Sequence, residues 1–221
     1  IEPIQGEGGV VVPPEGFLKE VERICRENDV LLIADEIQTG FGRTGKMFAV
    51  EHEGVTPDIM AMAKALGGIG LPLAGLMIRK ELDVWPDTGH VGTFRGHVLA
   101  MAAGAAAIRF ILERKLPERA AELGEHILKR LNDELGDLDI VGEVRGKGLM
   151  IGIEIVRDRK SKGPDPEKAK RIRQECFRRG LIVWGGGHYG NVVRLLPPLV
   201  ITRELVDKGL DILIDVIKAQ A

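Results

Sequence analysis

Two side chains in the first third of the chain have the type and the setting for cofactor chemistry. Asp35 directly follows the apolar run of residues 30–34, and Lys64 stands between two apolar stretches, ahead of a glycine-rich turn. A carboxylate at the end of a buried strand needs a partner, because without one its pKa rises. We expect Lys64 to be partly desolvated, which lowers an ammonium pKa and makes the amine nucleophilic. Such an amine can form a Schiff base with an aldehyde.

The stretch around Asp35, ADEIQTGFGRTGKM, also permits a nucleotide site. Gly40, Gly45 and Lys46 have the G-x-x-x-x-G-K spacing of a loop that binds phosphates. That loop needs a serine or threonine after its lysine to hold magnesium, and this position is Met47. Asp35 and Gly40 are also only five residues apart, so one short turn would have to supply two separate parts of the site. The sequence therefore disfavours nucleotide binding.

Each of the two residues has a simpler explanation when taken alone. Asp35 could be satisfied by backbone donors or by an arginine such as Arg43, and an isolated lysine is usually a solvated surface group. Taken together, Asp35 and Lys64 follow consecutive predicted strands, and open α/β sheets bind ligands at the carboxyl ends of their strands. Pyridoxal phosphate needs both a lysine for its aldehyde and an acid for its ring nitrogen.

The composition excludes several other classes of function. The chain has 221 residues, 44% of them hydrophobic, with a formal net charge of -2 and only 4% aromatic residues. Nothing basic or aromatic points to nucleic acid, and no apolar run approaches a membrane span. Two distant cysteines give neither a disulfide framework nor a zinc knuckle, so we expect a cytoplasmic protein. His90 and His97 lack partners with ligand spacing, and we expect no metal site.

The pattern along the chain predicts an α/β fold in two parts. We expect residues 1–115 to form the second part of a large cofactor-binding α/β domain with a mostly parallel sheet, and residues 116–221 a small α+β domain. Thr202 is the expected N-cap of the last helix. The expected helices cover 16–28, 98–112, 118–135, 166–179 and 203–219. The expected strands cover 30–34, 57–64, 73–78, two within 139–155, 181–184 and 192–196.

Six segments in series resemble the class III (ω-type) aminotransferases, which are fold-type I enzymes dependent on pyridoxal 5'-phosphate. The segments are IEPIQGEGG, LLIADEIQTGFGRTG, PDIMAMAKALGGIGLPLAG, GTFRGHVLAMAAGAAAI, VRGKGLMIGIE and VRLLPPLVIT, and they span nearly the whole chain in the family's order. Within the family, KELDVWPDTGHVGTFRG is most similar to the diaminobutyrate-2-oxoglutarate aminotransferases.

The resemblance implies a role for each matching residue. Lys64 matches the lysine that forms the Schiff base and later moves the proton, and Asp35 matches the acid paired with the pyridine nitrogen. Ile37 matches the apolar residue against one ring face, and Gln38 the side chain near the phenolic oxygen. Thr93 matches a threonine that reaches the cofactor phosphate of the neighbouring subunit, which implies a homodimer with shared active sites.

Glu2 and Arg194 match the switchable pair of the family. Arg194 would bind the α-carboxylate of a dicarboxylate such as 2-oxoglutarate, and Glu2 would neutralise Arg194 when an ω-amino substrate enters. The reaction implied is transfer of an amino group from an ω-amino or diamino acid to a 2-oxo acid. Racemases and epimerases of the same fold use the same lysine and aspartate, so racemisation stays an alternative.

The resemblance covers only the second half of the family's length. The first half normally carries a turn for the cofactor phosphate, an aromatic that stacks on the ring, and several strands of the sheet. We therefore expect the 221 residues alone to bind the cofactor poorly. An inactive fragment with a structural or oligomerising function is the third possibility.

Overall fold

The chain divides into two compact units. The computed structural model describes residues 1–68 and 70–221, and it omits Ile69 of the glycine-rich turn after Lys64. The first unit comprises Ile1–Pro3, Pro13–Gly42 and Lys46–Lys115, and the second comprises Ile4–Val12, Arg43–Gly45 and Leu116–Ala221. Two short segments that the sequence assigned to the first domain thus belong to the second unit.

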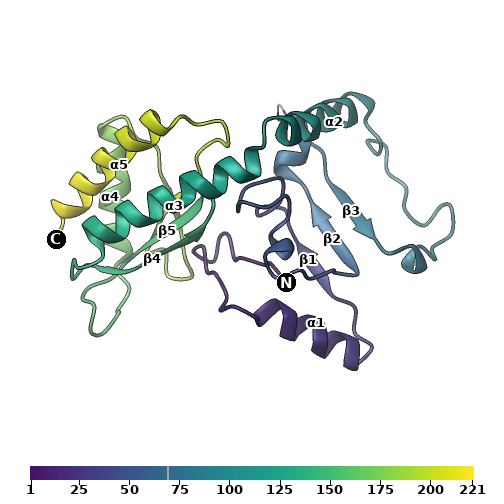
Figure 1. The fold of residues 1–221 in the computed structure, drawn as a ribbon, viewed down its shortest axis with the longest axis horizontal. Helices are drawn as coiled ribbons and strands as arrows, with labels where there is room; N and C mark the ends of the chain where they lie inside the picture. The colour runs from purple at the N-terminus through teal and green to yellow at the C-terminus, as the bar shows by residue number, and fades with distance from the viewer. Residues whose placement is uncertain (69) are drawn as a thin grey trace. The chain divides into compact units, whose positions relative to one another are not determined.

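The first unit contains a small mixed sheet in which β1 and β2 are parallel (Figure 1). Strand β3 pairs with the other edge of β2 and is antiparallel to it. The first two strands end at the same edge of the sheet, because parallel strands share their direction. The elements of this unit are α1 (Phe17–Glu27), β1 (Ile33–Asp35), β2 (Ile59–Met62), β3 (Gly75–Ile78) and α2 (Val98–Glu113), with 3₁₀ helices η1 (Ala49–His52), η2 (Lys64–Gly67) and η3 (Lys80–Leu82).

One buried carboxylate, that of Asp58, links the starts of β1 and β2 to the end of β3. Asp58 accepts hydrogen bonds from the backbone N–H of Leu32 at 2.8 Å and from the guanidiniums of Arg26 at 2.8 Å and Arg79 at 2.6 Å. Burial alone would raise the pKa of Asp58, but these donors hold it at about 2. A single side chain therefore links α1, the residue before β1, the start of β2 and the residue after β3.

The second unit has an antiparallel sheet in the order β4-β5-β7-β6, with helices on one face (Figure 1). Ile151, Ile153 and Ile155 of β5 enter the core that the helices share, so alternate residues of β5 point to the opposite face. Thr202 accepts a hydrogen bond from the backbone N–H of Leu205, which confirms the predicted N-cap. The elements are α3 (Leu116–Leu135), β4 (Val141–Lys147), β5 (Met150–Ile155), α4 (Pro166–Arg178), β6 (Trp184–Gly186), β7 (Val192–Leu195) and α5 (Arg203–Lys218).

Two apolar segments are more exposed than the sequence predicted. Val30, Leu31 and Ile33 are exposed, although an unbroken apolar run usually indicates a strand buried on both faces. Helix α2, which is rich in alanine and other apolar residues, leaves Val98 and Leu99 exposed. The helix predicted at 98–112 is confirmed as α2, whereas the strand predicted at 30–34 forms only from Ile33 to Asp35.

No helix among residues 1–68 and 70–221 combines the length and the apolar character needed to cross a membrane.

Candidate active site

The structure brings Asp35 and Lys64 to the same edge of the first sheet. Asp35 ends β1 and stands opposite Ala61 of the parallel strand β2. Lys64 follows Ala61 by three residues and opens η2, directly after the carboxyl end of β2. Ligands of open α/β sheets bind at this edge. The two residues are therefore placed where one small molecule could contact both.

The carboxylate of Asp35 has a defined orientation. Its Oδ1 accepts a hydrogen bond from the backbone N–H of Ile37 at 3.0 Å, and the residue is half-buried. Within the described part of the chain, Oδ2 has no hydrogen-bond partner. A strand-end carboxylate with one oxygen anchored and the other open is suited to accept a proton-bearing donor from a ligand.

Glu36, next to Asp35, anchors the loop that follows β1. Its carboxylate is fully buried and accepts hydrogen bonds from the hydroxyl of Thr39 and from the backbone N–H of Val50. Burial raises the pKa of Glu36, while these donors oppose that rise. Nothing in the local sequence marks this residue as buried, because a glutamate in a loop is usually exposed.

Lys64 has a strained backbone and an open amine. Its φ is +48°, in the left-handed region that residues with a Cβ adopt rarely and that is often found at functional sites. The side chain is exposed, which corrects the expectation of partial desolvation. That expectation rested on apolar neighbours in the sequence, but the neighbour Ala65 is itself exposed and does not shield the amine. Among the described residues, the amine has neither a hydrogen-bond nor an ion-pair partner. It is therefore accessible to an aldehyde.

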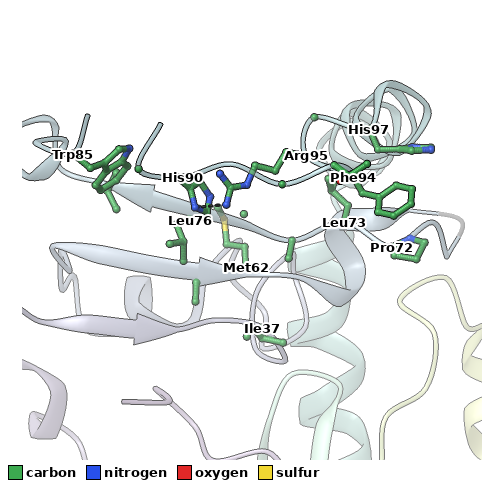
Figure 2. A pocket seen from close by; sticks show the side chains of 18 residues that line it. Ile37, Met62, Pro72, Leu73, Leu76, Trp85, His90, Phe94, Arg95 and His97 are labelled. Carbon is green, nitrogen blue, oxygen red and sulfur yellow. Dashed lines mark hydrogen bonds between the residues drawn. The ribbon is translucent and has the colours of Figure 1, made fainter. Parts of the chain in front are cut away.

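A cavity of about 980 Å³ adjoins this edge of the sheet. Of the predicted site residues, Ile37 and Thr93 line it, whereas Asp35, Gln38 and Lys64 do not. Figure 2 shows the apolar side chains of Ile37, Met62, Leu73, Leu76 and Phe94 around it, with His90 and Arg95 in contact with each other. The cavity therefore has a mostly apolar wall and one cationic group.

Arg194 forms an ion pair in the second unit, on strand β7. Its guanidinium donates to both carboxylate oxygens of Glu7, at 2.9 and 2.8 Å, to Gly6 O at 2.9 Å and to Gly185 O at 2.9 Å. The side chain of Arg194 is 3% exposed, and that of Glu7 is 76% exposed. A buried cation thus faces a solvent-exposed anion.

The carboxylate paired with Arg194 is that of Glu7, which corrects the prediction that Glu2 is its partner. The backbone explains the difference. Ile1 forms hydrogen bonds along β1, through its amino group to Ile33 O and through its carbonyl to the N–H of Asp35, so Glu2 belongs to the first unit. The turn of residues 5–11 belongs to the second unit, and Glu7 lies within it.

Comparison with known proteins agrees with the fold and shows the family. The family model for aminotransferase class-III matches residues 1–217. A leucine/methionine racemase of Thermococcus litoralis is 47% identical over 95% of this chain and 47% of that protein. A diaminobutyrate-2-oxoglutarate aminotransferase of Haemophilus influenzae is 47% identical over 89% of this chain and 44% of that protein. An aminotransferase structure from Bacillus anthracis has a TM-score of 0.94 at 34% identity, over 99% of this chain and 51% of that chain.

The chain belongs to the class III aminotransferases, a family of pyridoxal-phosphate enzymes with the type I fold. It spans about half the length of the relatives it matches. The residues at the sheet edge fit this cofactor, because within residues 1–68 and 70–221 the Lys64 amine has no hydrogen-bond or ion-pair partner and Asp35 has one carboxylate oxygen without a hydrogen bond. In the part of the chain that the structure describes, no group of three or more histidine, cysteine or acidic side chains could hold a metal ion.

Proposed function

We propose that this chain supplies the lysine and the acid of a pyridoxal-phosphate-dependent aminotransferase. The reaction is transfer of an amino group from an ω-amino or diamino acid to 2-oxoglutarate. The observation that carries the proposal is the position of Asp35 and Lys64 at the carboxyl ends of two adjacent parallel strands. Bound pyridoxal 5'-phosphate would supply an aldehyde that condenses with the lysine and a ring that withdraws electrons from the substrate.

Lys64 has two tasks in this proposal. Its amine would hold the cofactor, and it would accept the proton that the substrate carbon loses and deliver that proton to the cofactor carbon. Exposure of the amine supports both tasks, because a substrate amine must reach and replace it. Asp35 holds a proton at the ring nitrogen through Oδ2, since Oδ1 is occupied by the N–H of Ile37. A proton held there makes the ring a better electron acceptor.

Arg194 and Glu7 account for two kinds of substrate. A dicarboxylate such as 2-oxoglutarate would place one carboxylate on the Arg194 guanidinium, because bidentate arginine–carboxylate pairs are strong and directional. Glu7 would then move into solvent, where its exposure makes the move inexpensive. An amino donor without a carboxylate at that position would leave Glu7 on Arg194, so that no buried cation stays unpaired.

Three further assignments belong to this proposal. Ile37 would pack against one face of the cofactor ring, and Gln38 would lie near its phenolic oxygen. Thr93 would reach the cofactor phosphate of a second subunit in a homodimer. Exposure of Thr93 in this chain, at the wall of the cavity, supports a contact of that kind.

Racemisation is the second candidate. A racemase is as similar to this chain as an aminotransferase is, at 47% identity each. Both reactions would use Lys64 and Asp35, so the sheet edge alone does not separate them. The distinguishing property is the co-substrate, since only amino transfer consumes a 2-oxo acid.

An assay at saturating pyridoxal phosphate separates the candidates. We expect glutamate to form from 2-oxoglutarate and a diamino acid, and Lys64→Ala to lower this rate by at least about a hundredfold. Lys46→Ala, an exposed lysine on a nearby loop, is the matched control and should retain the wild-type rate. Loss of optical rotation of leucine without a co-substrate would support the racemase instead. If neither reaction occurs, the chain is an inactive fragment.

A further inference from the structure

Four residues form one row across the second sheet. Arg145 of β4 stands opposite Gly152 of β5, Gly152 opposite Arg194 of β7, and Arg194 opposite Trp184 of β6. Directly opposed residues of antiparallel strands place their side chains on the same face. This is the face away from the helices, because Ile151 and Ile153 on either side of Gly152 enter the helix-covered core.

The turn that carries Glu7 lies on this row. A Cβ on Gly152 would come within 3.1 Å of both Gly9 O and the Cβ of Val10, so the missing side chain makes room for the turn. Arg194 holds one side of the turn through Gly6 O and the carboxylate of Glu7. The backbone N–H of Gly187 also donates to Glu7 O at 2.9 Å.

Arg145 holds the other side of the same turn. Its Nε donates to Gly9 O and Val10 O, both at 3.1 Å, and its Nη2 donates to Gly9 O at 2.8 Å. Nη1 donates to Glu143 and Glu154, each at 2.8 Å, which balances the charge. The Arg145 side chain is only 13% exposed. Three hydrogen bonds to the turn and two to side chains of the sheet thus fix the turn relative to the sheet.

We propose that Arg145 is a positioning residue that sets how closely Glu7 covers Arg194. It does so without reaching either side chain, by fixing the backbone of Gly9 and Val10. A firmly held turn keeps Glu7 paired with Arg194, and a loosened turn exposes Arg194 to an incoming carboxylate. The balance between carboxylate-bearing and carboxylate-free substrates then depends on a residue outside the reacting centre. This inference rests on the carboxylate recognition by Arg194 proposed above.

The test measures binding of glutarate, a dicarboxylate without an amine or a keto group. Trp184 fluorescence in a Trp85→Phe background reports binding, since Trp184 lies beside Arg194 in the row and the chain has two tryptophans. Arg145→Lys keeps the charge opposite Glu143 and Glu154 but cannot make five hydrogen bonds in the guanidinium geometry. We expect Arg145→Lys to tighten glutarate binding by about fivefold, at the lower end of the usual range for coupled sites.

The same substitution is then made together with Glu7→Gln. We expect Glu7→Gln alone to tighten binding and Arg145→Lys to add nothing further, because Arg145 acts through Glu7. Arg130→Lys is the matched control, since Arg130 also pairs with acidic residues, here Glu134, Asp207 and Asp211, but lies on α3. It should leave binding unchanged. Gly152→Ala lifts the turn without removing a charge and should tighten binding as Arg145→Lys does.

The outcomes separate this inference from the proposed function. Glutarate binding that responds to Glu7→Gln but not to Arg145→Lys or Gly152→Ala would overturn the function of Arg145 alone. The same conclusion would follow if Arg145→Lys changed glutarate binding equally in the wild-type and Glu7→Gln backgrounds. That result would indicate a general structural change and not an effect through Glu7. Absence of glutarate binding in every variant, Glu7→Gln included, would contradict carboxylate recognition by Arg194 and with it the inference.

Discussion

Glu7 and Arg194 form an ion pair with very unequal exposure. Both oxygens of the Glu7 carboxylate contact the Arg194 guanidinium, yet 76% of the glutamate side chain is exposed and only 3% of the arginine. The carboxylate already contacts water, whereas the buried guanidinium needs a paired anion at all times, so Glu7 can leave only when another carboxylate replaces it. In the proposed function the pair would act as a fixed cation with an exchangeable counter-ion, which is the property that two alternative substrates require.

The position of Arg194 depends on a glycine beside it. A Cβ on Gly186 would lie 2.6 Å from the Arg194 Nε and 2.9 Å from its Cδ. We expect Gly186→Ala to displace the guanidinium from Gly185 O and to weaken glutarate binding at least about tenfold. Isothermal titration measures the loss. Unchanged binding would show that Arg194 does not select the carboxylate.

A second close contact fixes the hairpin between β4 and β5 against α3. A Cβ on Gly124 would come within 2.2 Å of the backbone oxygen of Gly148, an atom that cannot turn away. We expect Gly124→Ala to lower the free energy of unfolding by about 3 kcal/mol. Gly209→Ala, also on a helix, meets only the end of Leu181 at 3.4 Å and should be neutral or stabilise by up to about 1 kcal/mol. Urea denaturation compares the two, and equal effects would contradict the packing described.

Asp58 makes the stability of the first unit dependent on acid pH. We expect Asp58→Asn to lower the free energy of unfolding by about 2 kcal/mol at pH 7, because it weakens hydrogen bonds to two arginines. The folded-state pKa of about 2 lies below the ordinary value of 3.8. The ionised carboxylate therefore stabilises the fold above pH 3.8, and this contribution disappears as the pH falls through about 2.

The measurement for Asp58 is urea denaturation of both proteins between pH 7 and pH 2. The difference between wild type and Asp58→Asn should be constant above about pH 5 and shrink below it. A difference that persists at pH 2 would show that the charge of Asp58 is not what holds the strands.

The contribution of Glu36 to stability should change with pH in the opposite direction to that of Asp58. Its pKa is raised from 4.5 by burial, so ionisation costs free energy in the folded protein, and stability should fall as the pH rises above 4.5. Glu36→Gln removes this dependence, since the amide accepts from Val50 N–H and can donate to Thr39. Glu36→Ala leaves both donors buried without a partner and should cost about 2 kcal/mol. Thermal unfolding from pH 4 to pH 8 compares the variants, and equal losses in both would contradict this account.

The placement of Asp35 and Lys64 at one edge of the sheet was predictable from local sequence signals. Asp35 and Lys64 each follow a short apolar run, and the parallel pairing of those runs placed both residues at one edge. Helix limits followed from periodicity, and Thr202 marked the start of the last helix because a hydroxyl there can accept a free N–H. These signals depend on a few neighbouring residues, so they can be read without knowledge of the fold.

Long-range pairings were not predictable in the same way. Glu2 and Glu7 lie five residues apart in similar surroundings, and only the path of the backbone decides which one meets Arg194. A glutamate in a loop usually lies at the surface, but Glu36 is buried because the chain returns at Val50, whose N–H it binds. Exposure of Lys64 likewise depends on what surrounds the turn and not on its apolar neighbours. A sequence gives the type of a side chain but not its distant contacts.

The most direct test of the proposed site is the identity of the lysine that binds pyridoxal phosphate. The chain is mixed with the cofactor at less than one equivalent and reduced with borohydride, and the modified lysine is located by peptide mass spectrometry. We predict modification at Lys64 above Lys46 and all other lysines, and a weaker preference in Asp35→Asn, because the acid holds the ring nitrogen. Even labelling of the exposed lysines, unaffected by Asp35→Asn, would contradict a cofactor site at this sheet edge.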